Sequence, residues 1–306
     1  MPKKSDFTIS QTLKMAIKAF RAFGKNAGIE NARLEAELLL SHAMGISRSQ
    51  ILINSEDIVP ENQYHNFKRL VSEKLTGKPT AYILENAEFF GRKFIVDNSV
   101  LIPRPETEEL VEWIILSRAK NSKSKNPGDP EKHENILDLC TGSGCIGITL
   151  LCEMITLNIY MSDRSENALK IAGKNLEILK IQNLKRRPIV AEILKSDLFD
   201  EIRKDDFDLI VSNPPYVTPS EYDTLEAPVK NFEPREALLV EDSDTFNRRL
   251  IQGAFDHLRK SGWLYLETSP ALIESLGEIL NSVGYTNVET KKDLSGKDRF
   301  IRAQKP

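Results

Sequence analysis

The sequence has no apolar run near the roughly 20 consecutive residues that a membrane-spanning helix needs. Its first ten residues contain two lysines but no apolar core and no small-residue cleavage site, so they do not resemble a signal peptide. Of the 306 residues, 40% are hydrophobic and 28% are charged. These features predict a soluble protein in the cytoplasm.

Cysteine and histidine are also scarce. The three cysteines, Cys140, Cys145 and Cys152, crowd into one apolar stretch without the CxxC spacing of a zinc site, so we expect buried free thiols. The four histidines are scattered along the sequence, which indicates neither a metal cluster nor a Cys/His nucleophile pair. We therefore expect a site without a metal ion.

A large excess of charge of one sign is missing as well. The 42 basic and 45 acidic residues give a net charge of -3, which provides no overall field for binding a polyphosphate backbone. Direct binding to nucleic acid is therefore disfavoured. We expect a monomer.

The first 80 residues have the pattern of a small helical domain. Apolar residues recur at helical spacing in 13–20, and further helices are expected over 32–43 and around 67–75. Thr8 with Gln11 forms a predicted capping box, and Asn31 is the predicted cap of the second helix. Residues 1–80 are thus predicted to form a helical bundle.

Residues 81–104 have a different texture. Aromatic and β-branched residues at 89–90 and 94–96 flank Gly91-Arg92-Lys93, which predicts a β-hairpin linking two domains. The polar segment 121–135, which contains two prolines and a glycine, is predicted to be a loop ahead of the next strand.

Residues 105–306 are predicted to form an α/β domain, because short apolar strands alternate with helical stretches from Ile136 onward. Such alternation is typical of a mainly parallel sheet covered on both faces. The expected strands are 136–139, 159–162, 188–191, 207–211 and 263–267, and the clearest helices are 166–179 and 246–258.

A glycine-rich turn with GxGxxG spacing, from Gly142 to Gly147, directly follows the first of these strands. Taken alone it is weak evidence, because such turns bind many nucleotides and sometimes only pack a helix on a sheet. Asp163 ends the next strand about 20 residues later, where a carboxylate can accept hydrogen bonds from ribose hydroxyls. Its alternative interpretation is an acid that stabilises a helix N-terminus near Ser165.

Asp197-Leu198 follows the third predicted strand, at the edge where an adenine ring would lie. Asp197 is a candidate acceptor for the exocyclic amine and Leu198 a candidate cover for the ring, although both residues could simply end the strand. A dehydrogenase would need a proton-transfer group, and no histidine or lysine at a strand end stands out. A P-loop is excluded, because no Gly-Lys-Ser/Thr follows the glycines.

The fourth strand continues into Asn213-Pro214-Pro215-Tyr216, the most informative segment. Two prolines fix φ and remove two backbone donors, so the turn is stiff. If the Asn213 side-chain oxygen and the Pro214 carbonyl each accept one N–H of a substrate amide, the nitrogen lone pair points at an incoming methyl group. Tyr216 would pack beside the planar group. The alternative is a rigid exit turn with a surface tyrosine.

These residues resemble the HemK/PrmC family, the release factor glutamine methyltransferases of the class I fold that uses S-adenosylmethionine (AdoMet). The resemblance covers nearly the whole chain. Besides the Asn-Pro-Pro-Tyr motif, which adenine-N6 methyltransferases share, it is carried by Leu101–Glu108 (LIPRPETE), Glu88–Gly91 with Phe94, Glu233–Leu238 (EPREAL) and Lys292–Arg299 (KDLSGKDR).

The resemblance implies a Rossmann-like, mainly parallel seven-stranded sheet, with an N-terminal helical domain that helps bind the partner. The implied partner is a class I peptide chain release factor, methylated on the glutamine of its Gly-Gly-Gln loop. The implied AdoMet-binding residues are Cys140, Thr141, Gly142, Ser143, Gly144, Asp163, Asp197, Leu198 and Asn213. The implied substrate-binding residues are Asn213, Pro214, Pro215 and Tyr216, and of these Asn213, Pro214 and Tyr216 are the catalytic candidates.

Some alternatives remain open at this stage. Arg104 could reach the cofactor carboxylate or the partner, or form an ion pair with Glu106 or Glu108. Cys140 stands where many family members have glycine, which should narrow the cofactor turn slightly. Other functions to separate are a ribosomal-protein glutamine methyltransferase, a nucleic-acid adenine-N6 methyltransferase and a non-enzymatic AdoMet-binding scaffold.

Overall fold

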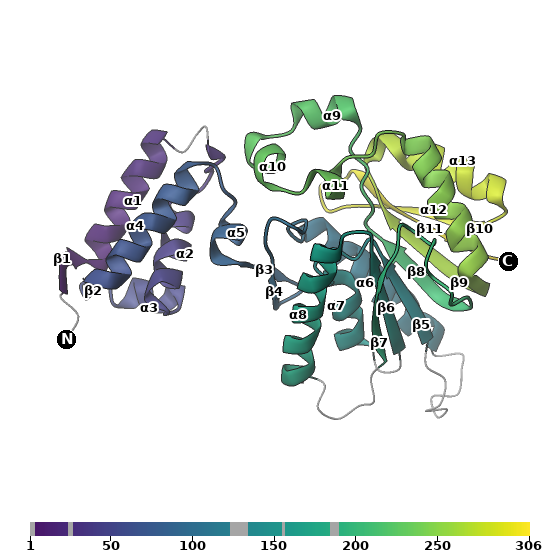
Figure 1. Cartoon of the computed structure of the whole chain (residues 1–306), viewed down its shortest axis with the longest axis horizontal. Helices are drawn as coiled ribbons and strands as arrows, with labels where there is room; N and C mark the ends of the chain where they lie inside the picture. Colours follow the sequence, from purple (N-terminus) through teal and green to yellow (C-terminus); the bar gives the residue numbers. More distant parts are fainter. Residues whose placement is uncertain (1–3, 24–26, 123–133, 155–156, 184–189) are drawn as a thin grey trace. The chain divides into compact units, whose positions relative to one another are not determined.

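The chain forms two compact units in its computed structural model, which describes residues 4–23, 27–122, 134–154, 157–183 and 190–306 (Figure 1). The first unit consists of Met1–Asn86 together with Thr224–Glu233, and the second of Ala87–Asp223 together with Pro234–Pro306. Each unit has its own apolar core.

The first unit is mainly helical, as the apolar spacing predicts. The predicted capping box is confirmed, because the Thr8 N–H donates to Gln11 Oε1 at 2.9 Å and the Gln11 N–H to Thr8 Oγ1 at 3.2 Å. Asn31 caps the second helix through the Leu34 N–H. The elements are β1 (Lys4–Thr8), α1 (Ile9–Phe23), α2 (Ala32–Met44), α3 (Arg48–Ile53), β2 (Ile58–Pro60), α4 (Glu61–Leu75) and α5 (Thr80–Leu84).

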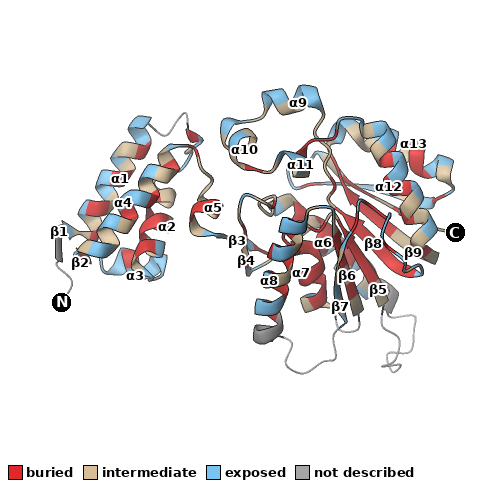
Figure 2. Ribbon diagram, in the orientation of Figure 1, coloured by how far each residue is buried: buried red, intermediate tan, exposed pale blue. Residues whose placement is uncertain are grey.

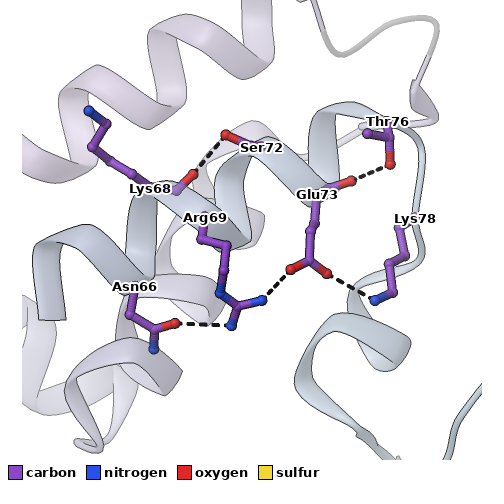
Figure 3. A network of polar contacts seen from close by, with 7 residues as sticks. All are labelled: Asn66, Lys68, Arg69, Ser72, Glu73, Thr76 and Lys78. Carbon is purple, nitrogen blue, oxygen red and sulfur yellow. Dashed lines mark hydrogen bonds and ion pairs between the residues drawn. The ribbon is translucent and has the colours of Figure 1, made fainter. Parts of the chain in front are cut away.

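A polar network holds the C-terminal end of α4 (Figure 3). Glu73 accepts hydrogen bonds from Arg69, one turn earlier, and from Lys78 Nζ at 2.9 Å, beyond the helix end. The Lys78 ammonium holds the pKa of Glu73 below its usual range. The Thr76 hydroxyl donates to the Glu73 carbonyl at 2.6 Å and the Thr76 N–H donates to the same carbonyl at 3.1 Å, so this carbonyl of the last turn accepts two hydrogen bonds.

A short helix from far along the chain also belongs to the first unit. This helix, α10 (Ala227–Phe232), lies in the segment Thr224–Glu233, and a Cβ built on Gly28 would approach Pro228 Cγ to 2.8 Å. Sequence reasoning assigned all of residues 105–306 to one domain and did not foresee this packing. The six residues of α10 are too few to show an apolar period, and none of them is buried.

The second unit is built on a seven-stranded sheet with the order β10-β11-β9-β8-β5-β6-β7. The five strands from β9 to β7 are parallel, while β11 and β10 are antiparallel to their neighbours. The mainly parallel sheet predicted from the sequence is therefore confirmed. Its strands are β5 (Glu134–Leu139), β6 (Leu157–Asp163), β7 (Ala191–Lys195), β8 (Phe207–Ser212), β9 (Leu258–Glu267), β10 (Thr286–Lys292) and β11 (Asp298–Gln304).

Both faces of this sheet are covered, so the central strand β8 is buried along its whole length and β5 is buried over its last four residues (Figure 2). Alternate residues of β5 enter different cores: Ile136 packs with α6 and α7, and Leu137 with α12 and α13. The helices are α6 (Pro105–Ser122), α7 (Cys145–Glu153), α8 (Glu166–Asn183), α9 (Pro219–Thr224), α11 (Arg235–Leu238), α12 (Ser243–His257), η2 (Pro270–Leu272) and α13 (Ile273–Val283).

The predicted hairpin is present as the two-stranded sheet of β3 (Asn86–Phe89) and β4 (Arg92–Ile95). Its turn is Phe90-Gly91 rather than the three residues expected, and both turn residues have positive φ, 50° and 69°. Two consecutive residues of positive φ match the right-handed twist of paired strands, which is why a two-residue turn is favoured.

Two predicted boundaries need correction. The third strand is β7, Ala191–Lys195, whereas 188–191 was expected; residues 188 and 189 lie outside the described residues, and Val190 precedes the strand. This edge strand has no buried residue, and Glu192 and Lys195 are exposed. Leu258 begins β9 instead of ending a helix. The predicted loop 121–135 falls largely on 123–133, outside the described residues.

No helix among the described residues is long and apolar enough to cross a membrane.

The connectivity of the sheet marks a specific edge. From β5 the chain proceeds to β6 and β7, and it then crosses to β8 on the other side of β5. Ligands of open parallel sheets bind where the strand order reverses, beyond the carboxyl ends of the strands. The carboxyl ends of β5, β6 and β8 are therefore the place to search for a site.

Candidate active site

A cavity lies at these carboxyl ends. It spans about 930 Å³ including its open mouth, and it is lined by residues that follow β5, β6, β7 and β8 in turn. Its lining includes Leu139 at the end of β5, Asp163 at the end of β6, Ser196 after β7 and Asn213 after β8. Residues far apart in the sequence thus meet at one sheet edge.

The glycine-rich turn forms one wall. Gly142 and Gly144 have φ values of 54° and 81°, in the left-handed region that glycine adopts without strain. A Cβ built on Gly142 would meet no described atom within 4 Å, so its backbone is open to a ligand. The Thr141 N–H donates to the Ser162 carbonyl at 2.9 Å, which ties the turn to β6.

Asp138, inside β5, holds the same turn from below. Its Oδ2 accepts from the Thr141 hydroxyl at 2.6 Å and from the Gly147 N–H at 2.9 Å. The residue is 0% exposed, and burial raises the pKa of its carboxyl to about 7. Sequence reasoning missed this residue, although an acid inside the apolar strand Ile136–Leu139 was a usable signal.

Asp163 connects two elements. Its Oδ2 accepts from the Gly142 N–H and its Oδ1 from the Ser165 N–H, each at 2.9 Å. Burial raises the pKa of this carboxyl. The contact with Ser165 matches the helix-start interpretation, while the position on the cavity wall matches the ligand interpretation. Each carboxylate oxygen has a second lone pair, so both roles are compatible.

The wall after β7 contains Asp197 and Leu198. Leu198 is only 5% exposed and has a positive φ of 52°, which turns the chain sharply beside the cavity. Asp197 is half exposed and forms an ion pair with Arg249, whose Nη2 lies 3.6 Å from Asp197 Oδ2. The Ser196 N–H donates to the Asp163 carbonyl at 3.1 Å, which links this wall to β6.

Asn213 is fixed at the end of β8. The Ser212 hydroxyl donates to the Leu139 carbonyl at 2.6 Å and joins β8 to β5 at this level. Asn213 Nδ2 donates to Thr107 Oγ1 at 3.2 Å, so the side-chain oxygen of Asn213 is left as an acceptor. Asn213 and Pro215 line the cavity, whereas Pro214 is buried and Tyr216 is half-buried outside the lining. Burial raises the pKa of Tyr216.

Most residues predicted for the site meet at this cavity. Cys140, Thr141, Gly142, Ser143, Asp163, Asp197, Leu198, Asn213, Pro215 and Arg104 line it, while Gly144, Pro214 and Tyr216 do not. Glu108, one suggested partner of Arg104, accepts from the Phe90 N–H at 2.8 Å. The lining also includes residues not predicted, chiefly Thr107, Glu236, Ala237 and Phe246. All but Phe246 lie in stretches that carry the family resemblance.

The residues present fit AdoMet. The cavity offers an open glycine backbone and a strand-end carboxylate at Asp163, together with the apolar cover of Leu198. The Ser143 hydroxyl, on the glycine turn, is buried without a hydrogen-bond partner among the described atoms, as expected of a group that a ligand would satisfy. Among the residues that the structure describes, no three His, Cys, Asp or Glu side chains gather as metal ligands do.

The cysteines are free, but only Cys145 is buried; Cys140 and Cys152 are half-buried. The expectation of three buried thiols is therefore wrong for two of them. Cys140 lies on the cavity wall and Cys152 lies in the last turn of α7, so neither side chain is completely covered by other residues. Burial nevertheless raises the pKa of the Cys140 thiol to about 12.

The fold and the cavity define a Rossmann-like methyltransferase that uses AdoMet, and comparison with known proteins agrees. Residues 125–231 match the model of the methyltransferase small domain. Residues 15–84 match the PrmC N-terminal domain.

The chain belongs to the release factor glutamine methyltransferase family. It is 40% identical over 286 residues to the release factor glutamine methyltransferase of Leptospira interrogans serovar Lai, covering 93% of this chain and 95% of that protein. It is 36% identical over 287 residues to the protein of the same name from Rhodopirellula baltica, covering 92% and 93%. It is 33% identical over 303 residues to that of Chlorobaculum tepidum, covering 98% of each.

Proposed function

We propose that this protein methylates the side-chain amide nitrogen (N5) of the glutamine in the Gly-Gly-Gln loop of class I peptide chain release factors. The names of its relatives support this substrate, since each is a release factor glutamine methyltransferase. The observation that carries the chemistry is the orientation of Asn213, whose Nδ2 is engaged by Thr107 while its oxygen remains available at the cavity. We expect the protein to act as a monomer in the cytoplasm.

The chemical problem is the weak nucleophilicity of an amide nitrogen, whose lone pair is delocalised into its carbonyl. Bound AdoMet supplies a methyl group made electrophilic by the positive sulfur. In our proposal the Asn213 side-chain oxygen and the Pro214 carbonyl each accept one N–H of the substrate amide. The two hydrogen bonds orient the nitrogen for in-line attack, and orientation of this kind is a major source of rate enhancement. As the N–C bond formed, the C–S bond would break and S-adenosylhomocysteine would leave, and the methylated nitrogen would lose one proton to water or to the same two oxygen acceptors.

The other residues have binding roles in this proposal. The turn from Cys140 to Gly144 would approach AdoMet with its backbone, and Asp163 would accept from the ribose hydroxyls. Asp197 and Leu198 would border the adenine ring. Pro215 and Tyr216 would hold the substrate side chain and exclude water, and Arg104 would contact the cofactor carboxylate or the release factor.

The direct test is mass spectrometry of a release factor after incubation with the protein and AdoMet. One added methyl group, 14 Da, on the loop glutamine is the expected product. Parallel reactions should contain ribosomal protein, DNA and RNA. Methylation of the ribosomal protein alone would indicate a ribosomal-protein glutamine methyltransferase, and methylation of adenine would indicate a nucleic-acid enzyme. No transfer despite tight AdoMet binding would indicate a scaffold.

Asn213→Ala should remove most turnover while leaving AdoMet binding nearly intact. The side chain acts on the nucleophile, so its loss falls on kcat, by about a hundredfold or more, as for other single groups that stabilise a transition state. Single-turnover methylation measures the rate of methyl transfer, and calorimetric titration measures the affinity for AdoMet. A parallel loss of binding and turnover would show that Asn213 serves the cofactor instead.

A further inference from the structure

Thr107 lies in the Pro-Arg-Pro-Glu-Thr-Glu stretch, and its hydroxyl has no part in the reaction as proposed so far. It occupies the first turn of α6, is 2% exposed and lines the cavity. Its N–H donates to the Arg104 carbonyl at 3.0 Å, which fixes its backbone, and its hydroxyl oxygen accepts from Asn213 Nδ2 at 3.2 Å. A residue of α6 therefore holds the side chain that ends β8.

A buried carboxyl lies on the other side of Thr107. Glu267, the last residue of β9, is 1% exposed, and a hydrogen bond with the Thr107 hydroxyl opposes the effect of burial on the pKa of its carboxyl. No described atom pairs with its Oε2. In its ionised form, which predominates above its pKa of about 7, the Glu267 carboxylate can only accept hydrogen bonds, so the Thr107 proton then points to it. The Thr107 hydroxyl can then interact with Asn213 only as an acceptor, through the lone pairs of its oxygen.

This arrangement decides which end of the Asn213 amide faces the substrate. The two ends of an amide have nearly the same shape but opposite hydrogen-bonding roles. If the amide were rotated by half a turn, its NH2 group would meet the N–H of the substrate, and no hydrogen bond could form. Because the Thr107 oxygen accepts, it favours the orientation with the Asn213 oxygen toward the cavity.

We propose that Thr107 is a positioning residue for methyl transfer: backed by Glu267, it holds the Asn213 amide with its oxygen directed at the substrate nitrogen. This inference rests on the proposed function. It assigns a role in the reaction to a residue of the Leu101–Glu108 stretch, which carries part of the family resemblance, and it explains why a polar side chain is buried at the start of α6.

Thr107→Val tests the inference, because valine has the same shape but no acceptor. We expect a roughly tenfold lower kcat, the size expected for one lost hydrogen bond. KM for the release factor and the dissociation constant of AdoMet should stay within about twofold, since neither ligand is bound through Thr107 in this scheme. Thr107→Ser keeps the hydroxyl and should restore kcat. Thr107→Ala repeats the test if valine does not fold.

Thr149→Val is the matched control. Thr149 is a 0% exposed threonine in α7, and it does not line the cavity. The same change there should leave kcat unaltered. Urea unfolding of all variants shows whether each is folded during the assay. A Thr107→Val enzyme with wild-type kcat, or a Thr107→Ser enzyme as slow as the valine variant, would overturn the inference.

A double-mutant cycle separates positioning from general packing. If Thr107 acts through Asn213, adding Thr107→Val to Asn213→Ala should change the residual rate by less than about twofold. An equal tenfold loss in both backgrounds would mean that Thr107 acts independently of Asn213. Failure of the proposed function looks different: the wild-type protein itself would leave the release factor glutamine unmethylated.

Discussion

Cys140 combines a strained backbone with an inert thiol at the start of the cofactor turn. Its φ of 60° is in the left-handed region, where a residue with a Cβ is less stable than glycine by roughly 1–2 kcal/mol. With its pKa raised to about 12, the thiol stays protonated near neutral pH and is no nucleophile. The position therefore matters through its backbone.

Substitution of Cys140 should separate backbone strain from the loss of the thiol. Cys140→Gly and Cys140→Val both remove sulfur, but a β-branched residue tolerates positive φ least. We expect the valine variant to be less stable than the glycine variant by about 1–2 kcal/mol or more. Urea unfolding at a single pH measures the difference. Equal midpoints for the two variants would show that the turn relaxes to another conformation.

The residues of the site were predictable to different degrees. Asn213 and Asp163 stood out because each directly follows a strand and belongs to a recognisable motif. The roles of Asp138, Thr107 and Glu267 were not predicted, because a buried polar group is defined by its partners, and those partners come from other elements. The sequence around a buried polar residue does not show which distant residues that side chain contacts.

At the level of elements, several long helices were predicted and others were not: α6, with 18 residues, and α13, with 11 residues, were missed. The long amphipathic helices α1, α2 and α8 were found, since several turns of apolar spacing are hard to mistake. The short helices α3, α5 and α10 were missed, because five or six residues show no period. The edge strand β7 was shifted because it lacks the continuous apolar run of the buried strands.

The packing of α12 beside the cavity depends on a glycine. A Cβ built on Gly253 would lie 2.3 Å from Cδ2 of Phe199, the residue that follows Leu198. The Phe199 ring cannot move away easily, because it stacks on His257 with ring centroids 4.7 Å apart. Gly253 thus lets α12 pack closely against the segment that borders the cavity.

Gly253→Ala should therefore destabilise the protein by about 1–3 kcal/mol through overpacking, even though alanine is the better helix former. Gly277→Ala in α13 is the control, because a Cβ there meets no described atom within 4 Å. That change should stabilise the protein by up to about 1 kcal/mol. Urea unfolding of both variants measures the contrast. If both variants gain stability, Phe199 adjusts freely and the contact is not a constraint.

For the whole molecule, two buried carboxyls couple stability to pH. Asp138 and Glu267 are 0% and 1% exposed, and burial raises the pKa of each to about 7, far above the usual value of a carboxyl. Both lie beneath the cavity, one holding the glycine turn and the other facing Thr107. The polar groups that shape the site are thus also groups that resist ionisation in the folded chain.

The contribution of these two groups to the free energy of unfolding should consequently fall as pH rises from about 4 to about 7. A folded-state pKa above the unfolded value favours the protonated native state, so this contribution is complete below the unfolded pKa and is lost as pH rises through about 7.

Asp138→Asn combined with Glu267→Gln mimics the neutral forms and should remove this pH dependence. The double variant should match the wild type only below about pH 4 and exceed it by several kcal/mol near pH 8, roughly as the linkage relation predicts. Carboxyls with lowered pKa, such as Glu37 and Glu73, are present in both proteins and cancel in this difference. Urea unfolding across this pH range measures the difference in the free energy of unfolding between the two proteins. If that difference is the same at every pH, neither carboxyl changes its ionisation on folding.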